Sequence, residues 1–440
     1  MIFAITALSL SAIAQDPIAV VEPSLEWTRR ASGENVVSIE LVSRRYEAQG
    51  KPDLWLVGVA HIAEESFYDD VAMLLDEMDI VLYESVRPSG SRQPSGNTEE
   101  ERVESTKKSL EFVADVAKRA AEESEVLPET LEDVISDASI LDRRLSGWVE
   151  DASVDAWGRP FALQVNQEEN TVTLWSFGSD GAVGGNGSAS DLTSTRTIVI
   201  EEIDLSELEL DEEIEFTDDE LENIDEEKEA TNKGMQEELA DILGLEFQLD
   251  ALPYEDPTWF CSDLTMDEVE SKLKERGADA SVLGTISGES FTAKIAVGLM
   301  KMIPMLDSLT NGGVKETAKL LMIEILSIPE SGQMLEGVEP DLAHVIIVDR
   351  NTELLSDIAA TIDIAEDLST IGVLYGAGHM SDLSPRLKGM FGYEPVEEKW
   401  LTAMSVNPND SFLDEKYMKQ MRVMLQLQIR NSEKQKKEKQ

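Results

Sequence analysis

The 440-residue chain contains one cysteine, three histidines and few basic residues. The single cysteine, Cys261, excludes an internal disulfide and a zinc site built from several cysteines. Its 37 lysine and arginine residues stand against 89 acidic residues, which gives a net charge of −52. Because phosphate contacts need clustered basic side chains, this balance argues against nucleic acid as a partner.

Long hydrophobic runs are also missing beyond the N-terminus. The nearest to one, residues 290–305, contains lysines and a proline, so it is predicted to be a core helix rather than a membrane span. Residues 2–10 form an apolar stretch that precedes Ala12-x-Ala14, a pattern that predicts a signal peptide over 1–14, although no basic residue precedes it. A buried N-terminal helix is the alternative. We expect an exported protein, periplasmic or extracellular, without a transmembrane segment in the mature chain.

Residues 25–90 have the pattern of an α/β domain. The apolar runs at 36–44, 53–60 and 79–85 predict strands, and the last two are too uniformly apolar to have one wet face. Helical spacing at 64–78 lies between those two runs. A strand, a helix and a strand within about thirty residues predict a right-handed βαβ unit with parallel strands.

The pattern changes between residues 100 and 230. Residues 101–123 predict an amphipathic helix, and 155–192 predict a β-hairpin with a glycine-rich loop, so we expect a small α+β domain over 100–200. Residues 201–229 hold seventeen acidic residues and one basic residue, Lys228. This composition predicts a solvated, partly disordered linker over 201–230.

Residues 231–405 return to α/β character. Helical spacing predicts helices at 235–245, 264–277 and 316–328, with a cap at Asp263 or Thr265. Apolar runs predict strands at 344–351 and 371–379, with a helix at 352–365 between them, and an edge strand or hairpin at 392–405. Residues 406–440 form a basic tail, which fits a frayed surface helix or a contact with an acidic partner.

Two of the three histidines follow the same pattern, an apolar strand that ends on G-x-x-H. His61 follows one such strand, His379 follows the other, and Glu84 ends a third. Because sites in α/β proteins form beyond the carboxyl ends of parallel strands, we expect these side chains to meet. Two imidazoles and a carboxylate suit an open site for a divalent transition metal. Each histidine alone could instead be a capping or core residue.

Two further polar residues lie in the run 344–351. Arg350, at the predicted end of this strand, could orient a carboxylate or stabilise an oxyanion, or it could be a structural ion-pair partner. His344, at the predicted start, is taken as structural.

These motifs resemble the TraB/Tiki family over about 27–88 and 231–403. The matching positions are Gly58, His61, Glu84, Arg350 with Asn351, Gly376, Gly378 and His379, while Asp349 replaces the commoner glutamate. The resemblance implies a mixed, mostly parallel sheet with flanking helices. It also implies a metal-dependent hydrolase, a peptidase acting on peptides or proteins. For this hydrolase the resemblance implies that His61, His379 and Glu84 bind manganese, cobalt or zinc, and that Glu84 and Arg350 are catalytic.

The inserted segment resembles a second family, the major pseudopilin of type II secretion. Asp155 begins a D-x-W-G-x-P motif, and Ser176 begins S-x-G-x-D-G-x-x-G-G. The family's membrane-embedded helix is missing. In that family the glycine-rich loop binds calcium, so the resemblance implies a calcium site at Asp180 and Asp191, with Ala189 where another aspartate is usual. A metal-free glycine-rich turn is the alternative.

Three functions follow as hypotheses. The first is the exported metal-dependent hydrolase. The second is a binding protein that holds haem or a metal with the same histidines and no turnover. The third is an interaction protein whose insert docks a protein partner. Haem would colour the purified protein, whereas removal of the insert would separate docking from catalysis.

Overall fold

The computed structural model describes residues 26–200, 235–278, 313–327, 340–364 and 368–412, together with Val423. The predicted signal peptide, the acidic linker, the predicted core helix at 290–305 and nearly all of the basic tail lie outside the described residues. In the described parts, no helix is both long enough and apolar enough to cross a bilayer.

The larger domain is built around one sheet. Its strands are β1 (Thr28–Gly33), β2 (Val36–Glu47), β3 (Asp53–Val59), β5 (Ile80–Tyr83), β10 (Trp259–Cys261), β11 (Thr370–Gly376) and β12 (Glu394–Val406). A second, two-stranded sheet pairs β4 (Ile62–Ala63) with β9 (Glu246–Phe247). The helices are α1 (Glu65–Leu75), α6 (Met235–Leu243), α7 (Gln248–Ala251), α8 (Met266–Glu275), α11 (Gly313–Leu326), α13 (Pro340–Ala343), α14 (Arg350–Ile364) and α15 (Met380–Phe391).

The order of hydrogen-bonded neighbours places β11 between β3 and β5. The path runs β1-β2-β3-β11-β5-β10, and β12 pairs with β2 along its other edge. Pairings β3–β11, β11–β5 and β5–β10 are parallel, whereas β1–β2, β12–β2 and β2–β3 are antiparallel. The α/β class with a mixed sheet is confirmed, but the expectation of a mostly parallel sheet is wrong, because the two kinds of pairing are equally frequent.

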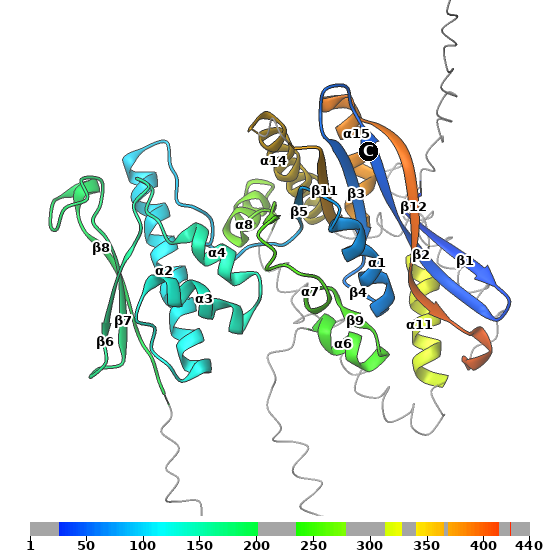
Figure 1. Cartoon of the computed structure of the whole chain (residues 1–440), viewed down its shortest axis with the longest axis horizontal. Coiled ribbons are helices and arrows are strands. Elements are labelled where there is room, and N and C mark those ends of the chain that lie inside the picture. The colour runs from blue at the N-terminus through cyan, green and yellow to red at the C-terminus, as the bar shows by residue number, and fades with distance from the viewer. Residues whose placement is uncertain are drawn as a thin grey trace, which may run out of the picture.

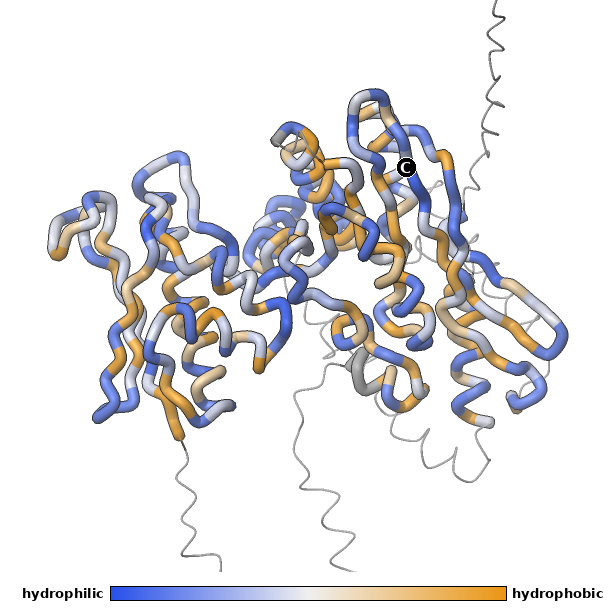
Figure 2. Tube along the Cα trace, in the orientation of Figure 1, coloured by the Kyte–Doolittle hydropathy of each residue, from blue (hydrophilic) through white to orange (hydrophobic). Residues whose placement is uncertain are grey.

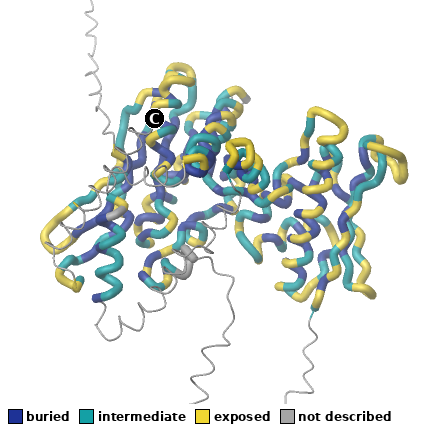
Figure 3. Tube along the Cα trace, turned by 180° about the vertical axis from the view of Figure 1, so that it is seen from behind, coloured by how far each residue is buried: buried dark blue, intermediate teal, exposed yellow. Residues whose placement is uncertain are grey.

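The central strands are buried on both faces, which explains their continuous apolar sequence. Side chains of β3 alternate: Leu54 and Leu56 pack in one core with α14 and α15, whereas Trp55 and Val57 pack in another with α1, α6 and α11. The domain therefore has three layers, with helices on both faces of the sheet (Figure 1). Apolar colouring follows the central strands in Figure 2, and the same strands are buried in Figure 3.

The predicted strand at 344–351 is wrong, because this segment is helical. It forms a π-helical turn, η2 (His344–Asp349), that joins α13 to α14. Of its apolar run only Val345 is buried, so the other valine and isoleucine side chains are not fully buried in a core as they would be in a central strand. Short apolar runs do not separate strand from helix, and the tertiary context decides here. Arg350 consequently begins a helix and does not end a strand.

The insert is a separate packing unit with its own core. Its helices are α2 (Glu99–Ser124), α3 (Leu131–Leu141) and α4 (Leu145–Ala152), and its antiparallel sheet has the order β6 (Ala162–Asn166), β7 (Thr171–Ser176), β8 (Leu192–Thr197). Asp155, the first residue of D-x-W-G-x-P, is buried and accepts the N–H groups of Trp157 and Arg159 and the hydroxyl of Ser176. The motif thus closes the turn that leads into β6.

Polar contacts fix the insert to the sheet domain. Pairing between β5 and β10 resumes beyond the strand ends as a parallel bridge between Arg87 and Thr265. Arg144, at the start of α4, donates to the hydroxyl of Ser85 at 2.7 Å, and Lys108 of α2 pairs with Asp267 at 2.6 Å. Arg144 thus contacts the chain just after β5, and Lys108 contacts α8, which follows β10. The insert is therefore docked on the sheet domain beyond the ends of these two neighbouring strands.

Candidate functional site

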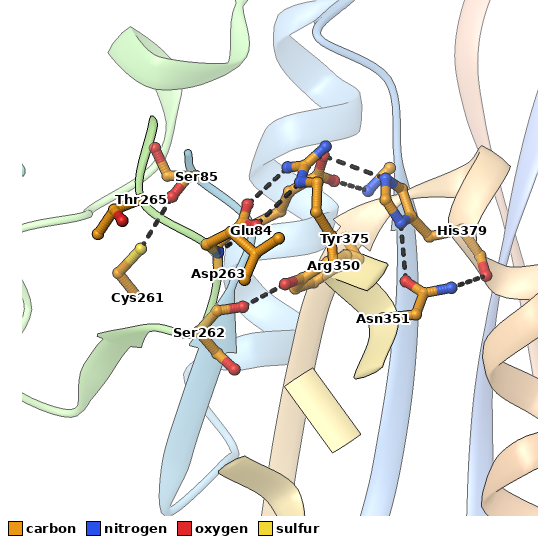
Figure 4. Close-up of polar contacts among 12 residues, drawn as sticks. Glu84, Ser85, Cys261, Ser262, Asp263, Thr265, Arg350, Asn351, Tyr375 and His379 are labelled. Carbon is orange, nitrogen blue, oxygen red and sulfur yellow. Dashed lines mark hydrogen bonds and ion pairs between the residues drawn. The ribbon is translucent and has the colours of Figure 1, made fainter. Parts of the chain in front are cut away.

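The carboxyl ends of the four parallel strands carry the polar cluster. His61 follows β3, Gly376 ends β11, Glu84 follows β5, and Ser262 with Asp263 follows β10. Since β3, β11, β5 and β10 are consecutive neighbours, these ends lie along one edge of the sheet. The structure therefore brings Glu84 and His379 together as the sequence predicts, and adds Asp263 to them (Figure 4).

Glu84 lies at the centre of this cluster. Its Oε1 accepts from Arg350 Nη2 at 2.7 Å and lies 3.3 Å from His379 Nε2. Its Oε2 accepts the backbone N–H of Gly376 at 2.6 Å. A Cβ on residue 376 would lie 3.2 Å from Oε2, so the close approach of the carboxylate explains this glycine.

The carboxyl group of Glu84 is held ionised. Burial alone would raise its pKa, but the charges of His379, Arg350 and His61 and the hydrogen bond to His379 lower the pKa well below its usual value. A carboxylate with so low a pKa is a poor proton acceptor near neutral pH. The surroundings of Glu84 therefore favour the role of ligand over the role of general base.

Arg350 joins two buried carboxylates. Its Nε and Nη2 bind Asp263 at 2.8 and 2.5 Å, and Nη2 also binds Glu84. Asp263 is completely buried, and Arg350 is 6% exposed. Burial alone would lower the pKa of Arg350, but Glu84 and Asp263 raise it above its usual value, so the guanidinium stays charged. Arg350 therefore has a structural ion-pair role, in which its single positive charge faces two carboxylates.

The sequence predicts Asp263 only as a possible helix cap. Thr265 is the N-cap of α8, and Asp263 instead faces Arg350. A signal was present, because Asp263 follows the apolar run Trp259–Cys261 just as Glu84 follows β5. A strand of three residues is too short to be distinguished by its period.

His379 is buried beside Tyr375 and Asn351. Its Nδ1 lies 2.8 Å from Asn351 Oδ1, and its ring meets Tyr375 edge to face, with centroids 5.2 Å apart. The Tyr375 hydroxyl donates to the carbonyl of Ser262. Burial raises the pKa of Tyr375 well above its usual value, so this hydroxyl keeps its proton. His379 therefore turns Nδ1 toward Asn351 and Nε2 toward Glu84.

His61 lies at the exposed side of the cluster. Its Nδ1 lies 3.1 Å from Gln248 Oε1, and the N–H of Gln248 donates to the His61 carbonyl at 2.9 Å. His61 is close enough for its charge to lower the pKa of Glu84. In contrast to buried His379, His61 is exposed to solvent, so a ligand would approach from its side.

The cluster contains the types of donor atom that a metal site needs, but these atoms are not close enough together to surround an ion. In the part of the chain that the structure describes, no three histidine, cysteine or acidic side chains are grouped so that they could hold a metal ion. The nitrogen and oxygen donors at hand are the imidazoles of His61 and His379 and the carboxylate of Glu84. The metal site at these residues stays a prediction.

The third histidine and the cysteine lie outside this chemistry. His344 Nε2 is 3.8 Å from Asp349 Oδ1 in the turn η2, and Asp349 also pairs with Arg276 at 3.3 Å. Burial raises the pKa of the Cys261 thiol to about 12, and its sulfur lies 3.1 Å from the carbonyl of Ser85. A thiol with this pKa is not a nucleophile at neutral pH.

The two aspartates of the glycine-rich loop differ in their surroundings. Asp180 Oδ1 accepts the N–H of Ala182 at 3.0 Å, and Asp191 Oδ2 accepts the N–H of Gly184 at 2.9 Å. Asp191 Oδ1 is buried and has no hydrogen-bond partner within the described structure. A buried carboxylate oxygen without a partner is costly, so this atom is free to bind a cation. The calcium site also stays a prediction.

Comparison with known proteins identifies the insert alone. Residues 96–195 match the family model of the type II secretion system (T2SS), protein G. This match confirms the pseudopilin-like module within the chain. No curated protein and no solved structure matches.

Proposed function

We propose that this protein is an exported metal-dependent hydrolase of the TraB/Tiki type that cleaves peptides. The observation that carries the proposal is the placing of His379. Its Nδ1 faces the Asn351 amide oxygen, and its Nε2 faces the Glu84 carboxylate at 3.3 Å. If Nδ1 carries the proton, a neutral ring presents a lone pair to a carboxylate, so a cation must lie between them. That cation is a second proton or a metal ion.

The donor set fits a transition metal. Imidazole nitrogen and carboxylate oxygen are ligands of manganese, cobalt and zinc, and exposed His61 leaves one side open. When bound, such an ion polarises a peptide carbonyl and lowers the pKa of water. Glu84 and the two histidines would hold it. Arg350 keeps Glu84 ionised, and the exposed side next to His61 admits the substrate.

Metal content tests this proposal. We expect purified protein, reconstituted with manganese, cobalt or zinc, to hold about one ion per chain and to cleave unstructured peptides. The double variant His61→Ala/His379→Ala should lose both the ion and the cleavage, as measured by elemental analysis and mass spectrometry. His344→Ala is the matched control, because His344 lies in η2 and pairs only with Asp349 among the contacts described. An ion retained in the double variant would contradict the site.

Export is part of the proposal. The apolar segment 1–14 supports it, as does the match of the insert to a secretion-system family. The docked insert would be the surface that meets a protein partner. The contacts of Arg144 and Lys108 with the sheet domain would hold it in place during such an encounter.

A calcium site in the insert is the second candidate, favoured by the unpartnered Asp191 Oδ1. Calcium at one hundred times its Kd would stabilise the insert by about 2.7 kcal/mol. We expect calcium to raise the unfolding midpoint, followed by tryptophan fluorescence, and Asp191→Asn to abolish that shift. Glu168→Gln, on an exposed turn of the same module, is the control that should leave it unchanged. Equal midpoints of wild type with calcium and with chelator would exclude the site.

A further inference from the structure

Both motif histidines make the same kind of hydrogen bond, although their partners come from two different helices. Each ring places Nδ1 against the oxygen of a side-chain amide: His61 against Gln248 at 3.1 Å, and His379 against Asn351 at 2.8 Å. Gln248 begins the short helix α7, and Asn351 is the second residue of α14. Both amides lie between the two histidines in the sequence, Gln248 187 residues after His61 and Asn351 28 residues before His379, so local sequence does not explain their common role.

The amide of Gln248 is fixed by its other contacts. Its Nε2 donates to the hydroxyl of Tyr254 at 2.8 Å, which leaves Oε1 to face His61. An amide oxygen only accepts, so the His61 nitrogen next to it must carry the hydrogen. Gln248 is 3% exposed, and its own N–H binds the His61 carbonyl. Gln248 therefore holds both the ring and the backbone of His61.

Asn351 is fixed in the same way. Its Nδ2 donates to Asp382 at 2.9 Å and to the carbonyl of His379 at 3.1 Å, and both of these partners are acceptors. If the amide were flipped, its Oδ1 would lie against the oxygens of Asp382 and of the His379 carbonyl. The orientation is therefore fixed, with Oδ1 next to His379 Nδ1. Asn351 is completely buried. It too holds both the ring and the backbone of its histidine.

We propose that Gln248 and Asn351 are positioning residues that keep a hydrogen on Nδ1 of His61 and of His379, so that Nε2 is the ring atom that each histidine can offer to a metal ion. A neutral imidazole has one donor and one acceptor nitrogen, so fixing the hydrogen on Nδ1 assigns the lone pair to Nε2. Hydrogen bonds of this kind orient histidine ligands and tune their affinity. The inference rests on the proposed function for its purpose, but the hydrogens on Nδ1 are properties of the metal-free protein, in which His379 Nε2 donates to the Glu84 carboxylate.

The first measurement is of the tautomers. The metal-free protein labelled with nitrogen-15 in histidine gives three imidazole patterns by long-range proton–nitrogen correlation, and His→Ala variants assign them. In the metal-free protein we expect a hydrogen on Nδ1 of both His61 and His379, and on Nε2 of His379 as well, where it faces Glu84. Gln248→Leu should move His61 alone to the Nε2–H form, and Asn351→Leu should move His379 alone. An Nδ1 without hydrogen at either histidine of the wild type would overturn the inference.

The second measurement is of metal affinity, with cobalt as the probe. Gln248→Leu should weaken cobalt binding by about 10–100-fold, and Gln248→Glu, which keeps an acceptor oxygen, should restore it. Tyr254→Phe leaves Gln248 in place but removes the group that fixes its amide, so a mixture of tautomers and a smaller loss are expected. Unchanged affinity in Gln248→Leu would overturn the positioning role. Hydrogen on both Nδ1 atoms of a wild type that binds no cobalt would instead overturn the proposed hydrolase and leave the hydrogen-bond assignment intact.

Discussion

Replacing Arg350 with methionine will lower the free energy of unfolding of the sheet domain by about 3–5 kcal/mol, because it removes one partner of a buried ion-pair cluster. Arg350 is the guanidinium that faces both Glu84 and Asp263, and both carboxylates are removed from solvent. Methionine fills a similar space but leaves Glu84 with the two histidines and Asp263 without the guanidinium that binds both of its oxygens. Urea unfolding at neutral pH, followed by circular dichroism, measures the loss.

The same variant should change the acid stability. In the wild type the folded pKa of Glu84 lies well below its unfolded value, so the stability it contributes is present above the unfolded pKa and is lost as the pH falls through the folded pKa. Without Arg350 the folded pKa rises, so acid unfolding should begin at a higher pH. Arg276→Met is the control, because Arg276 pairs with Asp349 at a more exposed site and should cost less than about 1 kcal/mol. Equal losses in the two variants would refute the role given to Arg350.

Glu84→Gln should weaken metal binding by on the order of 10³-fold or more, because an amide replaces the only charged ligand of the proposed site. Its effect on folding should be much smaller than that of Arg350→Met, since Arg350 keeps both hydrogen bonds to Asp263. Cobalt titration in competition with a chelator gives the affinity, and urea unfolding gives the stability. Peptide cleavage should disappear along with the metal.

Two controls separate this result from a general disturbance. Glu84→Asp keeps the charge but shortens the side chain, so some metal binding should remain. Asp357→Asn changes a carboxylate that accepts from Ser262 at 2.7 Å, outside the proposed ligands, and should leave metal binding unchanged. Full metal affinity in Glu84→Gln would show that Glu84 is not a ligand, whatever the behaviour of Arg350→Met.

Much of the sheet was predictable from apolar runs. The strands β2, β3, β5 and β11 are confirmed, as are the edge strand β12 and the helices α1, α6, α8, α11 and α14. The run at 344–349 misled because valine and isoleucine favour strands only where a sheet surface receives them. Here the chain is already helical at Pro340 and stays so through Ile364.

The strand-end rule predicts that Glu84 and His379 lie together, because it depends only on which strands are parallel. It could not find Gln248 or Asn351 in a positioning role. A single glutamine in the sequence EFQLDA carries no periodic or compositional signal, and its partner His61 is 187 residues away. Such pairs depend on tertiary contacts that no local pattern encodes.

The strand order also sets when the site assembles. β3 and β5 are made early but are not neighbours, and the strand that joins them, β11, is made near the end of the chain. Glu84 and Gly376 are 292 residues apart, so synthesis at about 5–20 residues per second separates their appearance by roughly 15–60 s. Throughout that interval the growing chain has Glu84 and His61 but lacks His379. A chain truncated before β11 lacks Gly376 and His379 and therefore holds no complete site.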